Sequence, residues 1–482
     1  MKIKKAYKSK NNKTRVFFNT IFVVAETVLD KGIFFIINVL MARYFAPELF
    51  GEYTTALGYA SLFAMFNDIG TKGTIIRSIR KDSAYEKEHV TSALVIKTSL
   101  VFISYAALAI SLFFVKYNTN TIYLILIFGI VRIGDEYRKV FYAIINAHEK
   151  FLWSSISNTI FASAFLVVTI LVVFFRGNYF HVAWSRLAVV IFLVSLLAYN
   201  ILKRTKLSFS YEKFKEFLPQ MLYFGLGKIF SNAYKTINIV IISMMLGTLY
   251  AGYFNNAFVF FLSLFFIPGN IERVLMPHIM KESIKDNKKK FQFTYDFYTR
   301  LYSILSFYLC IVFFLFAKDI ILLFYGKKYL PAVPILRILA FGLPPLFSVN
   351  NLMITLLDKQ RYATIFQGIA FVINVFSTFI LVYFFKVEGA AISTILTYLS
   401  LNLLSGFYLV KNDYIHFKNI GPVLFKIIGI TITTGAVYFI LLKNFHFFIS
   451  FPAVSITYAL LVLFVIVNKD DVRIVKEIFG KK

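Results

Sequence analysis

Apolar runs of about 20 residues recur along the whole chain, and this pattern limits the fold more than any other feature. Hydrophobic residues make up 59% of the 482 residues and charged residues only 16%, whereas soluble proteins average about 25% charged. A soluble core could not bury so much apolar surface. Fourteen runs are long enough to cross a bilayer, and they lie near 16–41, 50–68, 90–115, 121–146, 152–175, 179–202, 217–246, 249–277, 300–317, 333–357, 362–385, 389–410, 421–442 and 448–468. We therefore expect an all-α integral membrane protein with about 14 transmembrane helices.

The basic residues gather on one side of the expected membrane. The chain has 52 Lys and Arg against 24 Asp and Glu, a formal charge of +28. If the N-terminus is cytoplasmic, the basic clusters at 2–15, 72–87, 203–215, 281–290 and 469–482 all lie inside, and the short outside loops carry few. This asymmetry follows the positive-inside rule, so we expect both termini in the cytoplasm. It also explains the net charge without a nucleic-acid partner, and membrane lipids are the expected surroundings.

The apolar hairpin that begins at Asn38 and the one that begins at Asn238 share residues at a fixed spacing. At an offset of 200 residues Asn38 aligns with Asn238, and Gly51 and Gly252 fall one position apart. Transporters are commonly built from duplicated helix bundles. An offset of six helices, an even number, relates the copies by an axis along the membrane normal.

The repeat predicts a division of the chain into two parallel six-helix lobes and two extra helices. The lobes are 1–202 and 217–410, the linker is 203–216, and the extra helices and a basic tail fill 411–482. The linker mixes basic and aromatic residues, which suits either an amphipathic helix on the inner leaflet or a solvated connection. Pro344 and Pro345 lie inside the run at 333–357 and should kink it.

Three segments resemble one family of membrane proteins. They are ARYFAPELFGEYTTALGYASLFAMFNDIGTKGTIIRSI at 42–79, LFYGKKYLPAVPILRILA at 323–340 and VEGAAISTILTYLSL at 387–401. They are similar to the Wzx-type oligosaccharide flippases of bacteria, in the multidrug/oligosaccharidyl-lipid/polysaccharide exporter superfamily.

The resemblance implies a V-shaped pair of helix bundles around a cavity that opens alternately to each side. It also implies a cargo, an undecaprenyl-pyrophosphate-linked oligosaccharide that moves from the inner to the outer leaflet of a bacterial plasma membrane for surface polysaccharide such as O-antigen. Polysaccharide polymerase machinery is then an expected partner. Since one chain holds both lobes, we expect it to function as a monomer.

Several cations lie deep inside the predicted spans. A charge at the centre of a span costs at least about 2.5–3.5 kcal/mol, so it usually faces a wet cavity or a partner. The four deepest are Lys31, Arg132, Lys228 and Lys235. With Ser231, Asn232 and Asn238, the last two lysines form one polar stripe about 15 Å long. These residues are candidates for binding a pyrophosphate, unless acidic residues of other helices neutralise the lysines; Arg186 and Arg337, nearer the outside, are candidates for an outer ring of the cavity.

The deep carboxylates have two interpretations. Glu26 and Asp30 are four residues apart and share a helix face, which suits either a proton or sodium-ion coupling site or salt bridges to Lys31 or Lys235. Asp135 and Glu136 lie three and four residues from Arg132, a spacing that permits ion pairs within the helix. Lys97 is expected to extend its side chain to the inner membrane surface.

Signatures of enzyme chemistry are missing. The sequence has no phosphate loop, H-E-x-x-H or G-x-S-x-G motif. Its 6 histidines lack metal-ligand spacing, and its single Cys310 is expected to pack in an apolar run. We expect neither enzymatic activity nor a cofactor, apart from a coupling ion. A multidrug exporter and a flippase for a lipid-linked peptidoglycan precursor stay open; a membrane glycosyltransferase or polymerase is disfavoured by the short outside loops.

Overall fold

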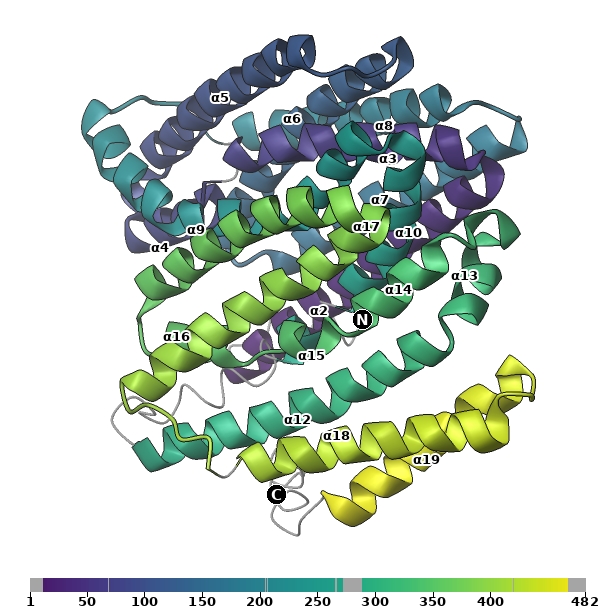
Figure 1. Cartoon of the computed structure of the whole chain (residues 1–482). Helices are drawn as coiled ribbons and strands as arrows, with labels where there is room; N and C mark the ends of the chain where they lie inside the picture. The colour runs from purple at the N-terminus through teal and green to yellow at the C-terminus, as the bar shows by residue number, and fades with distance from the viewer. Residues whose placement is uncertain are drawn as a thin grey trace. The chain divides into compact units, whose positions relative to one another are not determined.

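The computed structural model describes residues 12–67, 69–203, 205, 207–264, 267–271, 288–418 and 420–466, and every regular element in these ranges is helical. The α-helices are α2 (Asn12–Tyr44), α3 (Pro47–Ala64), α4 (Thr71–Lys81), α5 (Glu86–Ser111), α6 (Thr119–Ala147), α7 (Phe151–Phe174), α8 (Tyr179–Leu202), α9 (Tyr211–Met245), α10 (Thr248–Ser263), α12 (Lys288–Leu315), α13 (Ala317–Tyr325), α14 (Ala332–Ala340), α15 (Leu343–Leu346), α16 (Asn350–Leu356), α17 (Gln360–Lys411), α18 (Ile420–Val437) and α19 (Phe447–Val465) (Figure 1). The predicted all-α fold is confirmed.

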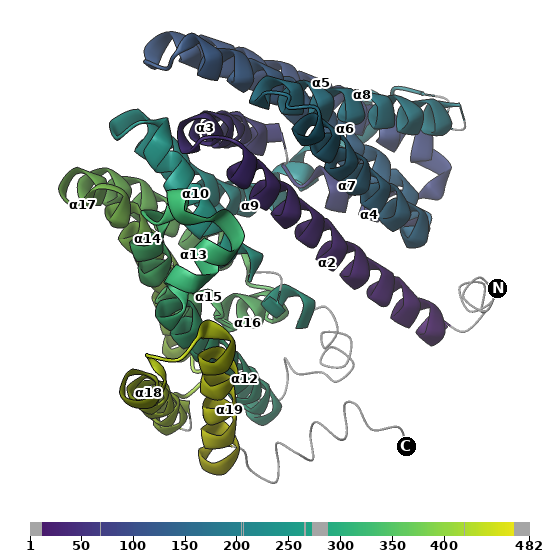
Figure 2. The same cartoon turned by 90° about the vertical axis from the view of Figure 1, so that its right-hand side faces the viewer.

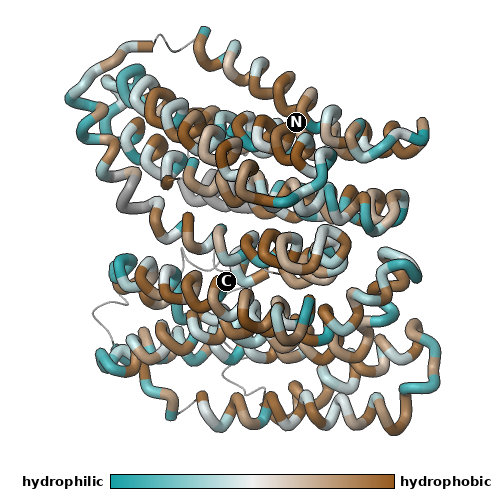
Figure 3. The backbone as a smooth tube through the Cα atoms, turned by 45° about the horizontal axis from the view of Figure 1, so that its top comes forward, coloured by the Kyte–Doolittle hydropathy of each residue, from teal (hydrophilic) through white to brown (hydrophobic). Residues whose placement is uncertain are grey.

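Each predicted apolar run coincides with one or more of these helices. By length and composition, eight helices of the described ranges can cross a membrane, or nine if one bent pair is a single span. Apolar residues line most of their length (Figure 3). The helices that carry the deepest candidate charges, α2, α6 and α9, are not among the eight. The chain is a multi-pass membrane protein, and fourteen spans stay a prediction from the sequence.

The predicted kink at the proline pair is present. The segments Ala332–Ala340 and Leu343–Leu356 meet at 54°. Pro344 and Pro345 lie in the first turn of α15, where a missing amide donor is tolerated. The prolines therefore begin a new helix and prevent α14 from continuing.

Helix α17 is a hairpin. The rings of Tyr362 and Tyr408 have their centroids 4.4 Å apart, although a straight helix would separate these residues by about 69 Å. Lys386, with a φ of 51° and a ψ of −133°, breaks the helical conformation. The two arms match the predicted spans 362–385 and 389–410 (Figure 1).

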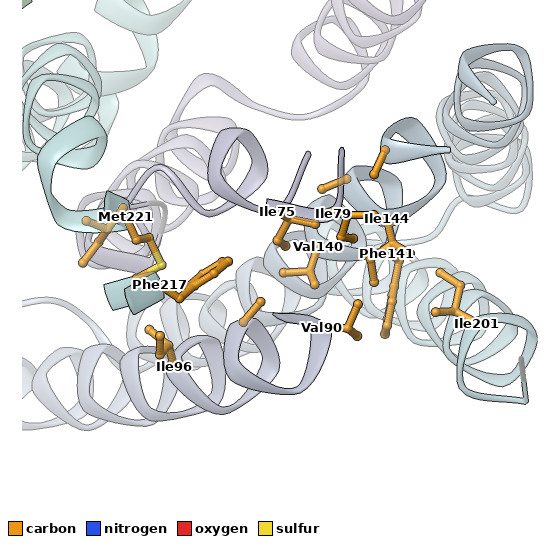
Figure 4. Close-up of a cluster of buried hydrophobic side chains, with 14 of the residues drawn as sticks. Ile75, Ile79, Val90, Ile96, Val140, Phe141, Ile144, Ile201, Phe217 and Met221 are labelled. Atoms are coloured by element: carbon orange, nitrogen blue, oxygen red, sulfur yellow. The ribbon is translucent and has the colours of Figure 1, made fainter. Parts of the chain in front are cut away.

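The first of two compact units comprises Met1–Val274 and Gln367–Ala390. In it α3 packs against α6, α9 and α10, while α2 packs against α7 and α6 against α8. A cluster of buried apolar side chains in this unit includes Ile75, Val90, Val140, Phe141 and Met221 (Figure 4). Helices α4, α5, α6 and α9 supply these residues, so this core holds together elements far apart in the sequence.

Helices α3 and α10 meet at two glycines. A Cβ atom added to Gly51 would lie 2.7 Å from the carbonyl carbon of Thr248, and one added to Gly252 would lie 3.0 Å from the Cα of Gly51. Real Cβ atoms essentially never approach other atoms to under 3.0 Å. These are the glycines that the repeat places one position apart, and small residues at such crossings let helices in membranes approach closely.

The second unit comprises Leu275–Phe366 and Ala391–Lys482. Here α12 packs against α14, α15, α18 and α19 (Figure 2). The predicted packing role of Cys310 is confirmed, since the side chain is buried on α12. The Asn350 side-chain amide donates to the Asn402 side-chain oxygen at 2.6 Å and ties α16 to the second arm of α17.

The two units divide the chain differently from the two predicted lobes. Helices α9 and α10 and the segment Gln367–Ala390 group with the first six predicted spans. One tie is the Thr378 hydroxyl, which donates to the Asn238 side-chain oxygen at 3.0 Å. The predicted lobes rest on the sequence repeat and stay a prediction.

Three connections between the predicted spans contain helical residues. The segment after the second span, predicted to lie inside, contains the amphipathic helix α4, and the predicted outside loop near 318–332 contains α13. The linker at 203–216 is not a separate amphipathic helix, because its last six residues begin α9. The clusters at 2–11 and 469–482, and residues 281–287 of the cluster at 281–290, lie outside the described residues.

Candidate functional site

Three charges on α6 form ion pairs along one face of the helix. The Asp135 carboxylate lies 3.4 Å from Arg132 Nη1 and 3.0 Å from Arg138 Nη2. Asp135 is buried, and Arg132 remains partly exposed and donates through Nη2 to the Ser61 hydroxyl of α3 at 2.7 Å. The ion pair that the sequence spacing permits between Arg132 and Asp135 is therefore present, whereas Glu136 pairs with lysines. Arg132 still has a partly solvated guanidinium.

A polar connection runs from α6 through α7 to α2. Arg138 donates to the Asn158 side-chain oxygen, and the Asn158 amide donates to Glu26 Oε1 at 2.8 Å. The Ser155 hydroxyl donates to the other Glu26 oxygen at 3.1 Å. Glu26 is thus held by neutral donors from α7.

Asp30 has a different environment from Glu26. Its carboxylate lies within electrostatic range of Arg138 and Lys31. Its Oδ1 is buried and has no hydrogen-bond partner in the described part of the chain. A buried carboxylate oxygen without a donor is unfavourable unless a proton, a cation or water reaches it.

Glu136 lies on another face of α6 and pairs with two lysines. Lys97 Nζ on α5 is 2.8 Å from Glu136 Oε2, and Lys139 contacts Oε1. Lys97 is only 1% exposed and also donates to the Asn67 carbonyl. The prediction that Lys97 reaches the membrane surface is wrong, because a buried carboxylate and a carbonyl hold its ammonium group inside the unit.

Lys31 of α2 and Lys235 of α9 interact electrostatically within the first unit. Each ammonium lies within electrostatic range of the other. Lys31 is exposed and Lys235 is partly buried, with its ammonium 5.9 Å from the Tyr234 ring centroid. Lys228, two turns earlier on α9, is exposed. An anion that lies between two like positive charges offsets their mutual repulsion.

The polar residues of the predicted stripe separate into two groups. Ser231 and Asn232 are partly exposed beside the lysines, and the Ser231 hydroxyl shares a hydrogen bond of 3.3 Å with Tyr234. Asn238 is 1% exposed, accepts from Thr378 and donates to the Ala390 carbonyl at 3.5 Å. Asn238 therefore braces the segment Gln367–Ala390 within the first unit and does not present its amide to a ligand.

Arg186 and Arg337 have unlike surroundings. Arg186 is 6% exposed, and its guanidinium carbon lies 5.2 Å from the Phe165 ring centroid and 5.7 Å from that of Phe34. Arg337 is exposed on α14 in the second unit. The buried position of Arg186 among aromatic rings is that of a packed cation.

Glu52 is a buried carboxylate that the sequence analysis missed. Tyr179 donates to its Oε2 at 2.9 Å, and the Asn118 amide donates to Oε1. Its partners lie 66 and 127 residues away along the chain. The only sequence signal was a glutamate inside an apolar run. No group of three or more metal-ligating side chains occurs in the described ranges.

Solved structures with this fold are transporters. A structure titled "Lipid II flippase MurJ, inward closed conformation" is 18% identical over 92% of this chain and 98% of its own, with a TM-score of 0.77. An inward-facing multidrug resistance transporter of the MATE family is 16% identical over 80% and 94%, with a TM-score of 0.64. A transporter from Pyrococcus furiosus, titled as having a binding pocket of reverse polarity, is 14% identical over 83% and 96%, with a TM-score of 0.57. No curated protein matches the chain significantly.

The chain is a multi-pass helical membrane protein with the fold of the multidrug/oligosaccharidyl-lipid/polysaccharide exporter superfamily. A family model described as "Polysaccharide biosynthesis protein" matches residues 40–334. The chain belongs to the polysaccharide biosynthesis protein family.

Proposed function

We propose that this protein is a flippase that moves undecaprenyl-pyrophosphate-linked oligosaccharide from the inner to the outer leaflet of a bacterial plasma membrane. It works by alternating access, as a monomer with both termini in the cytoplasm, and supplies surface polysaccharide biosynthesis. Membership of the polysaccharide biosynthesis protein family supports the pathway. A hydrated, charged head group crosses lipid very slowly without help, because burying unpaired charge is so unfavourable.

The electrostatic interaction of exposed Lys31 on α2 with partly buried Lys235 on α9 is the observation that carries the proposal. The two lysines come from different helices, and exposed Lys228 extends the positive charge along α9. Nearby Glu26 accepts hydrogen bonds from Ser155 and Asn158. A pyrophosphate offers several oxygens that these cations can share, whereas an organic cation would prefer an acidic or aromatic pocket.

Asp30 is the carboxylate we propose for coupling to a proton or a sodium ion. Its buried Oδ1 has no hydrogen-bond donor among the described residues, while both oxygens of Glu26 are occupied. The alternative role of Asp30 is a fixed counter-charge for Lys31 or Arg138. Transport driven by an ion gradient that continues after Asp30→Asn would favour the second role.

Removing both lysines of α9 should abolish surface polysaccharide. In a strain that lacks the gene, Lys228→Ala/Lys235→Ala is expected to give at least a roughly tenfold loss, because two cations of the pyrophosphate path are missing and each charge-assisted contact is worth about 1.5–3 kcal/mol. Lipid-linked oligosaccharide should then accumulate in the inner leaflet. The measurement is surface polysaccharide at matched membrane expression.

The matched control is Lys228→Arg/Lys235→Arg, which keeps both charges and should restore polysaccharide. Normal polysaccharide in the deletion strain itself would overturn the glycan-flippase proposal. Equal activity of the alanine and wild-type proteins would remove these lysines from the path.

A flippase for a lipid-linked peptidoglycan precursor is the second candidate, favoured by the likeness to the lipid II flippase structure. Both cargoes carry a diphosphate, so the same lysines would serve. Growth arrest with cell lysis on depletion, with surface polysaccharide unchanged in living cells, would select this candidate. A multidrug exporter is the third candidate, because the fold is also similar to that of MATE exporters. Sensitivity of the deletion strain to organic cations would favour it.

A further inference from the structure

A cavity of about 850 Å³ opens at one end of the first unit, and Lys31, Lys228 and Lys235 are not among the residues that line it. Its wall is formed where α5 begins, α6 ends, α7 begins and α8 ends. Loop charges assign this end to the cytoplasm. The volume lies within the range of pockets that hold small molecules.

The cavity is apolar on its inner side. Ile144, Ile145, Leu197 and Ile201 line it. Ile144 and Ile201 belong to the buried cluster of the first unit (Figure 4), and Ile145 and Leu197 pack against that cluster. This wall rests on a packed core and offers a preformed apolar surface to an acyl chain.

The rim of the cavity is cationic. His148 and Glu86 pair with each other at 2.8 Å, which satisfies the single acidic residue of the lining. Lys87 and Lys150 are exposed at the rim, and neither ammonium has an ion-pair partner in the described ranges. Two basic side chains above an apolar wall match a molecule with an anionic head and an apolar tail.

Trp153 also lines the cavity and is 62% exposed. Exposed tryptophans of membrane proteins gather at the level of the lipid head groups, where the ring is in lipid and the indole N–H meets polar groups. The position of Trp153 therefore sets this cavity at the membrane surface. An acyl chain there enters from the bilayer and does not have to cross water.

We infer that this cavity binds one anionic phospholipid of the cytoplasmic leaflet, with its phosphate between Lys87 and Lys150 and an acyl chain against the isoleucine and leucine wall. Its lining shares no residue with the proposed path for cargo. It ties the ends of four helices to the leaflet in which negative lipids concentrate. The lipid site and the flippase function are independent proposals, so failure of either one would leave the other in place.

The fluorescence of Trp153 supplies the test. The chain has 2 tryptophans, Trp153 and Trp184, so replacing Trp184 leaves Trp153 as the single reporter. The full chain carrying Trp184→Phe is reconstituted in phosphatidylcholine vesicles with increasing phosphatidylglycerol brominated on its acyl chains, which quenches tryptophan on contact. Half-maximal quenching is expected at a lower mole fraction of brominated phosphatidylglycerol than of brominated phosphatidylcholine. Lys87→Gln/Lys150→Gln should raise that mole fraction by about fivefold for each lysine removed.

Three controls make the result specific. Lys87→Arg/Lys150→Arg should keep the preference, and so should Lys116→Gln/Arg176→Gln, which removes two exposed cations elsewhere in the same unit. Trp153→Phe leaves only Trp184, which should show no preference. Equal quenching of Trp153 by both lipids, or equal loss in the Lys116/Arg176 variant, would overturn the inference. Loss of the preference on adding inorganic phosphate would make the cavity a site for soluble anions and would overturn the lipid assignment.

Discussion

Gly51→Ala should lower the free energy of unfolding by about 3 kcal/mol, the upper end of the usual cost of overpacking. The new methyl group would lie 2.7 Å from the Thr248 carbonyl carbon, and Gly252 leaves no side chain between the helices that could move aside. The atoms that the methyl group meets belong to the backbone and cannot move aside as a flexible side chain could. Helices α3 and α10 must therefore separate and lose contact along the crossing. Unfolding in mixed detergents, followed by circular dichroism, measures the effect.

Gly73→Ala on α4 is the matched control. A Cβ atom there meets nothing within 4 Å, so alanine should leave stability unchanged or raise it by about 0.5–1 kcal/mol. A Gly51→Ala protein as stable as this control would show that α3 and α10 do not approach as closely as described.

Lys97→Met should destabilise the protein by about 3–5 kcal/mol, the usual result when one member of a buried ion pair is removed. Methionine keeps much of the volume but leaves the buried Glu136 carboxylate with Lys139 alone. The Asn67 carbonyl also loses its donor. The same unfolding measurement applies.

The double variant Lys97→Met/Glu136→Gln separates charge from packing. With both charges gone, it should recover at least about half of the lost stability. Lys116→Met, at an exposed site, should change stability by no more than about 0.5 kcal/mol. A double variant less stable than Lys97→Met alone would mean that the lysine acts mainly by packing.

Much of the fold could be predicted because lipid imposes a length on every apolar run. The runs at 362–385 and 389–410 were predicted as separate spans, although only the three residues 386–388 lie between them. Lys386 is the residue at which the helix breaks. The helix α4 was missed because eleven residues are too short to span a bilayer. Its isoleucines at 75, 76 and 79 alternate with basic residues at helical spacing, a signal that could have found it.

The candidate site was less predictable, because burial of a charge depends on which helices meet. Depth within a span selected Lys31 and Lys235 as candidates but could not tell that Arg186 packs among aromatic rings or that Asn238 braces a distant segment. Near the end of a span, Lys97 could reach either the surface or a partner. Only the position of Glu136 on the neighbouring helix decides between them.

The hydrogen bond between Asn238 and Thr378 also sets an order for biogenesis. The two residues are 140 positions apart, and the first segment of the second unit, Leu275–Phe366, is translated between them. At synthesis rates of about 5–20 residues per second, Asn238 waits roughly 7–28 s on the ribosome before its partner exists. The first unit therefore cannot complete its fold co-translationally as an N-terminal block. Until the segment Gln367–Ala390 emerges, a polar amide on α9 must be sheltered by the insertion machinery or by water.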